Sequence, residues 1–453
     1  MSLKRAVVLS GGGAKGGYQI GAWQALREIG YSPDIVTGTS VGSFNGALLV
    51  SNKFDEAMDL WQNIGMECIF AQFAEDFQGK KDKQGNYLIK LTKEALLKGG
   101  ADFAPLHKRI IDLVDEEVIR QSDIDFGMVT TTFPYKKQVR IFVDKIPQGQ
   151  VVDYIFASAA AFPLVRSYKI EGVKFVDGGY SDNLPVQMAI DRGAQEIVAI
   201  NMGKMSLQRL KENTVKIRYI NNKKPLNDVS FGCAAIFDRE LSRKNIRLGY
   251  LDTMKAFSLY EGHYYTFEKN EKYRFLESSA LCSLNFEKVF SVLPSNNRFE
   301  KRGRENVLGL FAQFNANPFE YNTNAMYCAE MAAEIFQIDP REIYTFQNIS
   351  DMLIKEIETL FAEESAEKIA RLIEQLDAGL SFELFKTLIN SWDKKLLLGF
   401  CTRLFLEDEF TVTDKRRLTV VAALFPDVFT AALFCCAAIL DRRLTASLIS
   451  RKE

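Results

Sequence analysis

The first strand-like run of the chain ends in a cluster of glycines, and this succession constrains the fold most strongly. Residues 5–9 form a short run in which every residue after Arg5 is apolar. Residues 11–17 read Gly-Gly-Gly-Ala-Lys-Gly-Gly. A short apolar run that stops at glycine is typical of a buried parallel strand. Glycines between a strand and a helix leave backbone N–H groups free, and these groups stabilise a phosphate or an oxyanion. The sequence therefore predicts an α/β fold with an anion-binding loop.

The same alternation of strand-like and helical patterns continues over the first two hundred residues. Apolar residues recur at helical spacing in 18–29 and 41–50. Further strand-like runs are 34–37, 126–132, 138–143, 173–176 and 196–201. Strands that alternate with helices predict a doubly wound, mostly parallel sheet with helices on both faces.

A different pattern follows in the rest of the chain. The strand signal fades after Met205, and residues 349–376 are charged and periodic at helical spacing. We expect a boundary near Leu293–Asn297. This divides the chain into an α/β domain over 1–293, with its motifs in 5–204, and a mostly helical domain over 294–453 to which the sequence assigns no role.

Composition excludes several classes of partner and cofactor. Lys and Arg total 57 against 58 Asp and Glu, for a net charge of −1, so the charge balance predicts no nucleic-acid partner. The seven cysteines and two histidines lack metal-ligand spacing, and no calcium-loop pattern occurs, so no metal or cofactor is expected. The cysteines predict reduced thiols in a cytoplasmic protein. The sequence makes no prediction of oligomeric state.

Two apolar segments could indicate a signal peptide or a membrane-spanning helix. The apolar start, Met1–Leu9, is shorter than a signal peptide requires, which leaves only signal-independent secretion open. Residues 418–440 are long enough to span a bilayer, but Pro426 and Asp427 interrupt them. We expect two short buried helices there, since proline starts helices and an aspartate is costly in the membrane.

The second motif, Gly38-Thr39-Ser40-Val41-Gly42, fits the pattern G-x-S-x-G. A nucleophilic serine on a sharp turn between strand and helix needs small residues two positions away on each side. A strand-like run precedes this motif, and a helix rich in small residues follows it. Ser40 is therefore the candidate nucleophile.

A nucleophilic serine needs a base that accepts its proton. Ser40, Asp177 and His263 stand in the order of an α/β-hydrolase triad, but several strands precede the serine in that fold, and here only one does. We expect His263 to be a surface or packing residue and His107 to lie at a helix start. Asp177-Gly178-Gly179 directly follows the strand-like run 173–176, and active sites gather at the carboxyl ends of strands in open α/β sheets. Asp177 is the better candidate.

Together these motifs resemble the patatin-like phospholipases. Gly11–Gly16 is similar to the glycine-rich oxyanion loop of that family, Gly38–Gly42 to its nucleophile elbow and Asp177–Gly179 to its D-G-[AG] motif. Residues 157–163 and 181–186 resemble the segments that flank the aspartate.

The resemblance implies a three-layer α/β/α fold and a dyad without histidine. Ser40 would attack the ester carbonyl, Asp177 would act as general base, and the loop of Gly11, Gly12 and Gly13 would form the oxyanion hole, with the N–H groups around Gly12 and Gly13 as donors. The motif glycines are Gly16, Gly38, Gly42, Gly178 and Gly179. A carboxyl that serves as base without a histidine is expected to be desolvated, with a raised pKa.

The substrate follows from the resemblance alone: a lipid or another acyl ester, met at a membrane surface by a peripheral protein. Residues 66–105 mix aromatic and charged residues, which fits either a lid or a surface insertion. Two other functions stay open. Gly11–Gly16 also fits a dinucleotide loop, with Asp34 near the position of the ribose ligand. Alternatively, the chain is a non-catalytic interaction protein whose helical part is functional.

Overall fold

The chain folds as two compact units, Met1–Ser258 and Leu259–Glu453. The computed structural model describes residues 3–69, 103–203, 215–226, 236–269, 298–313, 321–361, 393–407 and 409–449. The boundary expected near Leu293–Asn297 lies outside these residues. The observed division falls earlier in the chain because β10 (Thr266–Glu268) pairs with β11 (Ile343–Tyr344) of the second unit.

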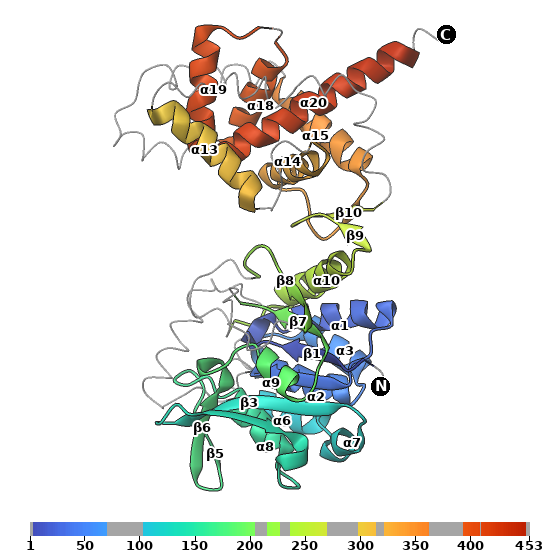
Figure 1. Cartoon of the computed structure of the whole chain (residues 1–453), viewed down its shortest axis with the longest axis vertical. Helices are drawn as coiled ribbons and strands as arrows, with labels where there is room; N and C mark the ends of the chain where they lie inside the picture. Colours follow the sequence, from blue (N-terminus) through green and yellow to red (C-terminus); the bar gives the residue numbers. More distant parts are fainter. Residues whose placement is uncertain are drawn as a thin grey trace. The chain divides into compact units, whose positions relative to one another are not determined.

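The first unit is built on an eight-stranded, mostly parallel sheet (Figure 1). Its strands are β1 (Arg5–Leu9), β2 (Ile35–Thr39), β3 (Asp125–Phe133), β4 (Gln138–Phe142), β5 (Tyr168–Ile170), β6 (Val173–Asp177), β7 (Glu196–Asn201) and β8 (Lys216–Asn221). The order is β5-β6-β3-β2-β1-β7-β8, with β4 also paired to β3. Pairs among β1, β2, β3, β7 and β8 are parallel, whereas β4, β5 and β6 run antiparallel to their neighbours.

Helices cover both faces of this sheet, and the strand period decides which side chain meets which layer. Val7 and Leu9 of β1 join the core beneath α1 (Gly17–Ile29), α2 (Val41–Val50), α3 (Phe54–Asn63) and α8 (Val151–Ser158). Ala6 and Val8 point the other way and join the core beneath α9 (Val186–Asp191). The three-layer α/β/α architecture is thus confirmed. The other helices of the unit are α4 (Met66–Ile69), α6 (Ala104–Leu113), α7 (Glu116–Gln121) and α10 (Arg239–Ala256).

The register of β3 positions the site. Its residues Asp125–Val129 pair with β2, and its residues Thr130–Phe133 pair with β6 along the same edge, while β4 occupies the opposite edge. β2 and β6 therefore lie end to end along β3, with their carboxyl ends facing each other. Thr39 is paired with Val129 and Asp177 with Thr130, so the residue after β2 and the last residue of β6 must meet.

The strands and helices expected in the first two hundred residues are all present. β8 was not expected, because it follows the point where the strand signal fades. It is an edge strand of mostly half-exposed residues, so its sequence carries little apolar pattern.

The second unit is mostly helical, as expected. Its helices are α13 (Arg298–Gln313), α14 (Tyr321–Ile335), α15 (Phe346–Leu360), α18 (Lys394–Phe405), α19 (Val412–Leu424) and α20 (Pro426–Ile449), beside a small sheet of β9 (Tyr260–Glu261), β10 and β11. α19 ends at Leu424 and α20 begins at Pro426, so the apolar segment is divided at the proline as expected, and Val428 and Phe429 are fully buried. α20 is not the short helix that was expected, since it has 24 residues. Within the described ranges, no helix is long and apolar enough to cross a bilayer.

Candidate active site

Ser40 lies on a strained turn between β2 and α2. Its backbone has φ 56° and ψ −128°, a conformation that non-glycine residues rarely adopt. The flanking glycines make this turn sterically feasible. A Cβ on Gly38 would lie 2.3 Å from the carbonyl oxygen of Gly42, and a Cβ on Gly42 would lie 2.5 Å from that of Leu9. The G-x-S-x-G spacing therefore reflects close backbone packing around the serine.

Ser40 and Asp177 meet as the register of β3 requires. The Ser40 hydroxyl donates a hydrogen bond to Oδ2 of Asp177 at 2.6 Å. The other carboxylate oxygen, Oδ1, accepts the backbone N–H of Gly179 at 2.7 Å. A Cβ on Gly178 would lie 2.2 Å from the carbonyl oxygen of Val129, so the turn after Asp177 also needs a glycine. Both carboxylate oxygens of Asp177 are therefore held in place.

Asp177 is buried, with 8% of its surface exposed. Burial raises the pKa of its carboxyl to about 6, and the hydrogen bonds from Ser40 and Gly179 offset part of that rise. Among the described residues, no lysine, arginine or histidine forms an ion pair with it. The raised pKa fits the expectation for a carboxyl that acts as a base near neutral pH.

Ser158, at the end of α8, is a residue that sequence reasoning did not single out. Its hydroxyl oxygen accepts the backbone N–H of Ser40 at 2.8 Å, and its hydroxyl donates to the carbonyl oxygen of Val129 at 2.7 Å. It thus ties the strained turn to β3. The backbone N–H of Asp177 donates to the carbonyl of Ala160 at 2.8 Å, so the same segment supports both residues of the pair. The only sequence signal was the run of small residues in 157–163.

The glycine-rich loop lies directly beside Ser40. A Cβ on Gly11 would lie 3.1 Å from Cβ of Ser40, and Gly13 has φ 56°. The N–H of Gly11 donates to the carbonyl oxygen of Asn183 at 3.1 Å, so this amide is already engaged. Gly12 and Gly13 are the remaining candidate donors of the three. Lys15 donates from Nζ to the carbonyl oxygen of Met202 at 2.9 Å, which tethers the loop to the end of β7.

Among the described residues, no histidine is hydrogen-bonded to Ser40 or Asp177. The ring of His107, in α6, stacks on Phe156 with centroids 3.9 Å apart. His263 belongs to the second unit, where its backbone N–H donates to Glu330 at 2.6 Å and its ring meets Tyr327 edge-on. Both rings pack against aromatic residues, as expected for histidines without a catalytic role.

The dinucleotide alternative finds no support at Asp34. This residue precedes β2, whereas the glycine-rich loop follows the carboxyl end of β1, and these two strands are parallel. The carboxylate of Asp34 accepts the backbone N–H of Arg5 at 2.8 Å. It therefore lies at the opposite end of the sheet from the loop.

Other expected features fall partly outside the described residues. Of the segment 66–105, the structure describes α4 and the start of α6, and residues 70–102 lie outside it. No group of three or more potential metal ligands occurs within the described ranges. The described cysteines are thiols and not disulfides: Cys68, Cys328, Cys401, Cys435 and Cys436.

Residues 7–190 match the family model of the patatin-like phospholipases. This domain belongs to the patatin-like phospholipase family. The matched residues include the glycine-rich loop, Ser40 and Asp177, and they lie within the first unit.

Curated relatives match the same part of the chain. "Lysophospholipase nte1" of Aspergillus terreus is 30% identical over 198 residues, which is 44% of this chain and 12% of the relative. "Lysophospholipase NTE1" of Phaeosphaeria nodorum is 32% identical over 200 residues, with the same two coverages. "Patatin-like phospholipase domain-containing protein 7" of Rattus norvegicus is 29% identical over 201 residues, 44% of this chain and 13% of the relative. The patatin-like domain thus matches about an eighth of the length of these relatives.

Among solved structures, VipD from Legionella pneumophila aligns over 94% of this chain and 92% of its own, at 15% identity and a TM-score of 0.34. A TM-score this low does not establish a shared fold. The fold therefore rests on the strands and helices described above.

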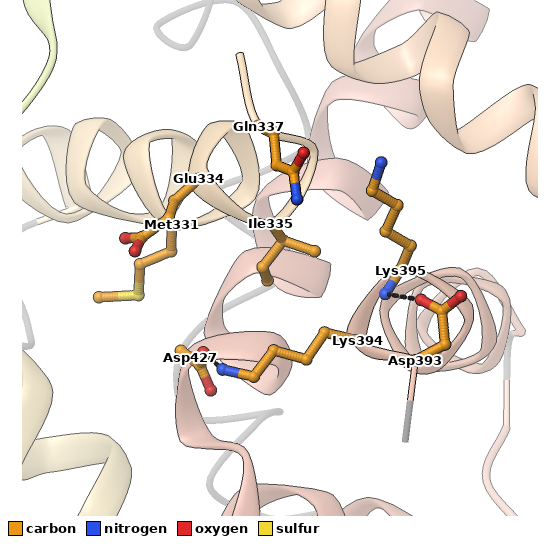
Figure 2. A pocket seen from close by; sticks show the side chains of 8 residues that line it. All are labelled: Met331, Glu334, Ile335, Gln337, Asp393, Lys394, Lys395 and Asp427. Carbon is orange, nitrogen blue, oxygen red and sulfur yellow. Dashed lines mark hydrogen bonds and ion pairs between the residues drawn. The ribbon is translucent and has the colours of Figure 1, made fainter. Parts of the chain in front are cut away.

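The second unit contains a pocket of its own, separate from the Ser40–Asp177 site (Figure 2). It has a volume of about 330 Å³ and is lined by residues of α14, α18 and α20 together with the segments that flank them. Lys394 and Asp427 form an ion pair across it at 2.6 Å, and Asp393 accepts the backbone N–H of Lys395 at 2.8 Å. Neither Ser40 nor Asp177 lines this pocket.

Proposed function

We propose that the first unit is a serine acyl hydrolase that cleaves lipid carboxylic esters. The observation that carries the proposal is the 2.6 Å hydrogen bond from the Ser40 hydroxyl to the buried carboxylate of Asp177. A nucleophile within hydrogen-bond distance of a base is the geometry that covalent acyl transfer requires. The glycine-rich loop beside the serine supplies the third element, a set of backbone N–H groups near the reacting carbon.

In the first half of the reaction, Asp177 accepts the hydroxyl proton while Ser40 Oγ attacks the ester carbonyl. The N–H groups of Gly12 and Gly13 hold the negative oxygen of the tetrahedral intermediate. The intermediate collapses to an acyl-serine ester, and Asp177 returns the proton to the leaving alcohol. The N–H of Gly11 takes no part because the carbonyl of Asn183 already binds it.

In the second half, water replaces the alcohol. Asp177 removes a proton from the water as it attacks the acyl-serine carbonyl, and the same N–H groups bind the second oxyanion. Collapse releases the fatty acid, and the proton on Asp177 returns to Ser40 Oγ. One carboxyl thus serves as base and acid in both halves, which requires a pKa near the working pH. The raised pKa of Asp177, about 6, supports this assignment.

The proposed substrate class follows from the relatives. Two of the three curated relatives described above are named lysophospholipases, and the family is that of the patatin-like phospholipases. We therefore assign a phospholipid or lysophospholipid as substrate, met at a membrane surface by a peripheral protein. The site needs no metal or cofactor, since Asp177 and the loop amides supply the base and the oxyanion donors.

The proposal is tested by hydrolysis of p-nitrophenyl esters of increasing chain length. The wild type is compared with Ser40→Ala and Asp177→Asn, and His263→Ala serves as control. Activity that is lost in the first two variants, kept in the control and strongest with long acyl chains supports a lipid hydrolase with a Ser–Asp pair. Loss of activity with His263→Ala would restore a histidine base. Full activity in Ser40→Ala would exclude the serine as nucleophile.

A further inference from the structure

The hairpin of β5 and β6 carries positive charge that no acidic residue of the described ranges pairs with. Lys169 and Lys174 occupy directly opposite positions in the antiparallel pair, and both are exposed. Like charges opposite each other on one face of a sheet are destabilising. Within the described ranges neither lysine has an acidic partner. The carboxylate of Glu171, in the hairpin turn, accepts a hydrogen bond from Nε2 of Gln150 at 2.9 Å and not from either lysine.

Exposed aromatic and basic residues adjoin this lysine pair. Phe133, near the end of β3, is the partner of Lys174 on the other edge of β6, so the two side chains share one face of the sheet. The turn after Phe133 contains Tyr135, Lys136 and Lys137, all exposed, and 88% of Tyr135 is accessible to solvent. A tyrosine ring this exposed gains nothing from packing within the chain.

The same surface reaches the turn that follows Asp177. Tyr180 lies three residues beyond Asp177 and is 57% exposed. Its hydroxyl donates to the carbonyl oxygen of Phe162, and the rings of Phe162 and Phe133 have centroids 5.3 Å apart. These contacts connect the turn after Asp177 with the end of β3 and the lysine pair. Figure 1 shows β5 and β6 as a hairpin beyond the body of the sheet.

We propose that the docking patch of Tyr135, Lys136, Lys137, Lys169, Lys174 and Tyr180 binds the surface of an anionic lipid bilayer. Lysines near such a surface are attracted by its negative potential, and tyrosine rings are enriched at the level of the headgroups. Bound in this way, the bilayer neutralises the Lys169–Lys174 repulsion and lies next to the turn that carries Asp177. The inference rests on the proposed function only where it makes the bilayer the source of substrate. Docking itself requires no catalysis.

The test measures partitioning of the full chain, carrying Ser40→Ala, onto sedimented phosphatidylcholine vesicles with and without phosphatidylserine. Lys169→Gln/Lys174→Gln is compared with the control pair Lys4→Gln/Lys216→Gln, which removes the same charge. Lys4 and Lys216 lie at the amino ends of β1 and β8, the opposite end of the sheet from Ser40, and each has an acidic partner, Asp125 at 4.0 Å and Glu196 at 3.5 Å.

We expect the Lys169→Gln/Lys174→Gln variant to bind the anionic vesicles about tenfold or more weakly than the parent chain does. The control variant should bind them less than about twofold more weakly. High salt should remove this difference, because it screens exposed charges. Tyr135→Ser should weaken binding to both kinds of vesicle and gives an independent test if the double variant folds poorly. Equal losses in the two pairs, or unchanged binding in the Lys169/Lys174 pair and in Tyr135→Ser, would overturn the proposal.

A second measurement separates this inference from the proposed function. With Ser40 intact, Lys169→Gln/Lys174→Gln should hydrolyse a soluble short-chain ester at the wild-type rate and lose activity only on anionic vesicles. If the wild type hydrolyses no ester while vesicle binding still depends on the lysine pair, the hydrolase assignment fails and the docking patch stands. If soluble hydrolysis depends on Ser40 but binding ignores the lysines, the docking patch fails and the hydrolase stands.

Discussion

Two aspartates, one in each unit, show how the surroundings of a carboxylate decide what it can do. Asp177 is buried beside Ser40, and no described cation pairs with it, so its pKa is raised to about 6. Asp427 lies in the first turn of α20 in the second unit and forms an ion pair with Lys394 at 2.6 Å. Burial without a neighbouring cation raises the pKa of a carboxyl and makes the carboxylate a better base. The first arrangement suits proton transfer and the second suits the packing of helix ends.

The largest expected effect is a loss of kcat when either member of the Ser40–Asp177 pair in the first unit is replaced. Ser40→Ala and Asp177→Asn should each lower kcat on a p-nitrophenyl ester by about 10⁴-fold or more, because the nucleophile or its base is lost. Asp427→Asn is the matched control in the second unit and should leave kcat unchanged. A comparable loss of activity in Asp427→Asn would contradict the contrast between the two carboxylates.

The variant Ser158→Ala tests whether the strained turn at Ser40 needs the hydrogen bonds that link it to β3. Ser158→Ala leaves the N–H of Ser40 and the carbonyl of Val129 without this partner, at a cost of about 1–3 kcal/mol. If that cost falls on the reactive geometry of Ser40, kcat drops about tenfold to a hundredfold with little change in KM. The control is Ser350→Ala in α15, whose hydroxyl bonds to the carbonyl of Phe346 within its own helix. Equal activity in the two variants would show that Ser158 has no positioning role.

Two glycines give opposite expectations for stability. A Cβ on Gly42 would collide with the carbonyl oxygen of Leu9, so Gly42→Ala should lower the free energy of unfolding by about 1–3 kcal/mol. Gly309 lies in α13 of the second unit, and a Cβ there would meet nothing within 4 Å. Gly309→Ala should therefore raise the free energy of unfolding by about 0.5–1 kcal/mol. Denaturant titrations of both variants check the signs, and destabilisation by Gly309→Ala would contradict the open surroundings of that position.

The smallest effect is the pH dependence that the raised pKa of Asp177 implies. The base must be ionised, so kcat/KM should be half-maximal near pH 6 and fall about tenfold for each pH unit below it. An ordinary, exposed aspartate would keep nearly full activity down to about pH 5. A pH–rate profile of the wild type decides between these outcomes. A profile that is flat between pH 5 and pH 7 would mean that Asp177 is not the titrating base.

Much of the site could be anticipated from local sequence because its parts are local. The backbone around Ser40 accepts glycine alone at the positions two residues away on each side, and that steric demand is visible as G-x-S-x-G. The glycine-rich loop and the turn after Asp177 have similar demands. Continuous strand-like runs likewise predicted β1, β2, β3 and β7, whose side chains are buried on both faces or nearly so.

Longer-range features could not be anticipated in the same way. Asp177 was expected at a strand end because ligands gather at the carboxyl ends of parallel strands, yet β6 runs antiparallel to β3. The aspartate reaches the site because β3 extends beyond β2 and pairs with β6 along the same edge. Strand order and direction depend on pairing between distant segments, which no local pattern encodes.

For this chain, the motifs around Ser40 and Asp177 were enough to name the residues of the candidate site, and the alternation of strand-like and helical segments was enough to name the class of its fold. The tertiary structure alone decided how they meet. It joined Ser40 to Asp177 across 137 positions of sequence through the register of β3, added Ser158 as a support, and engaged the N–H of Gly11 with Asn183. The physical reason is that steric demands act between sequence neighbours, whereas hydrogen-bond partners and burial are set by whichever segments the fold brings together.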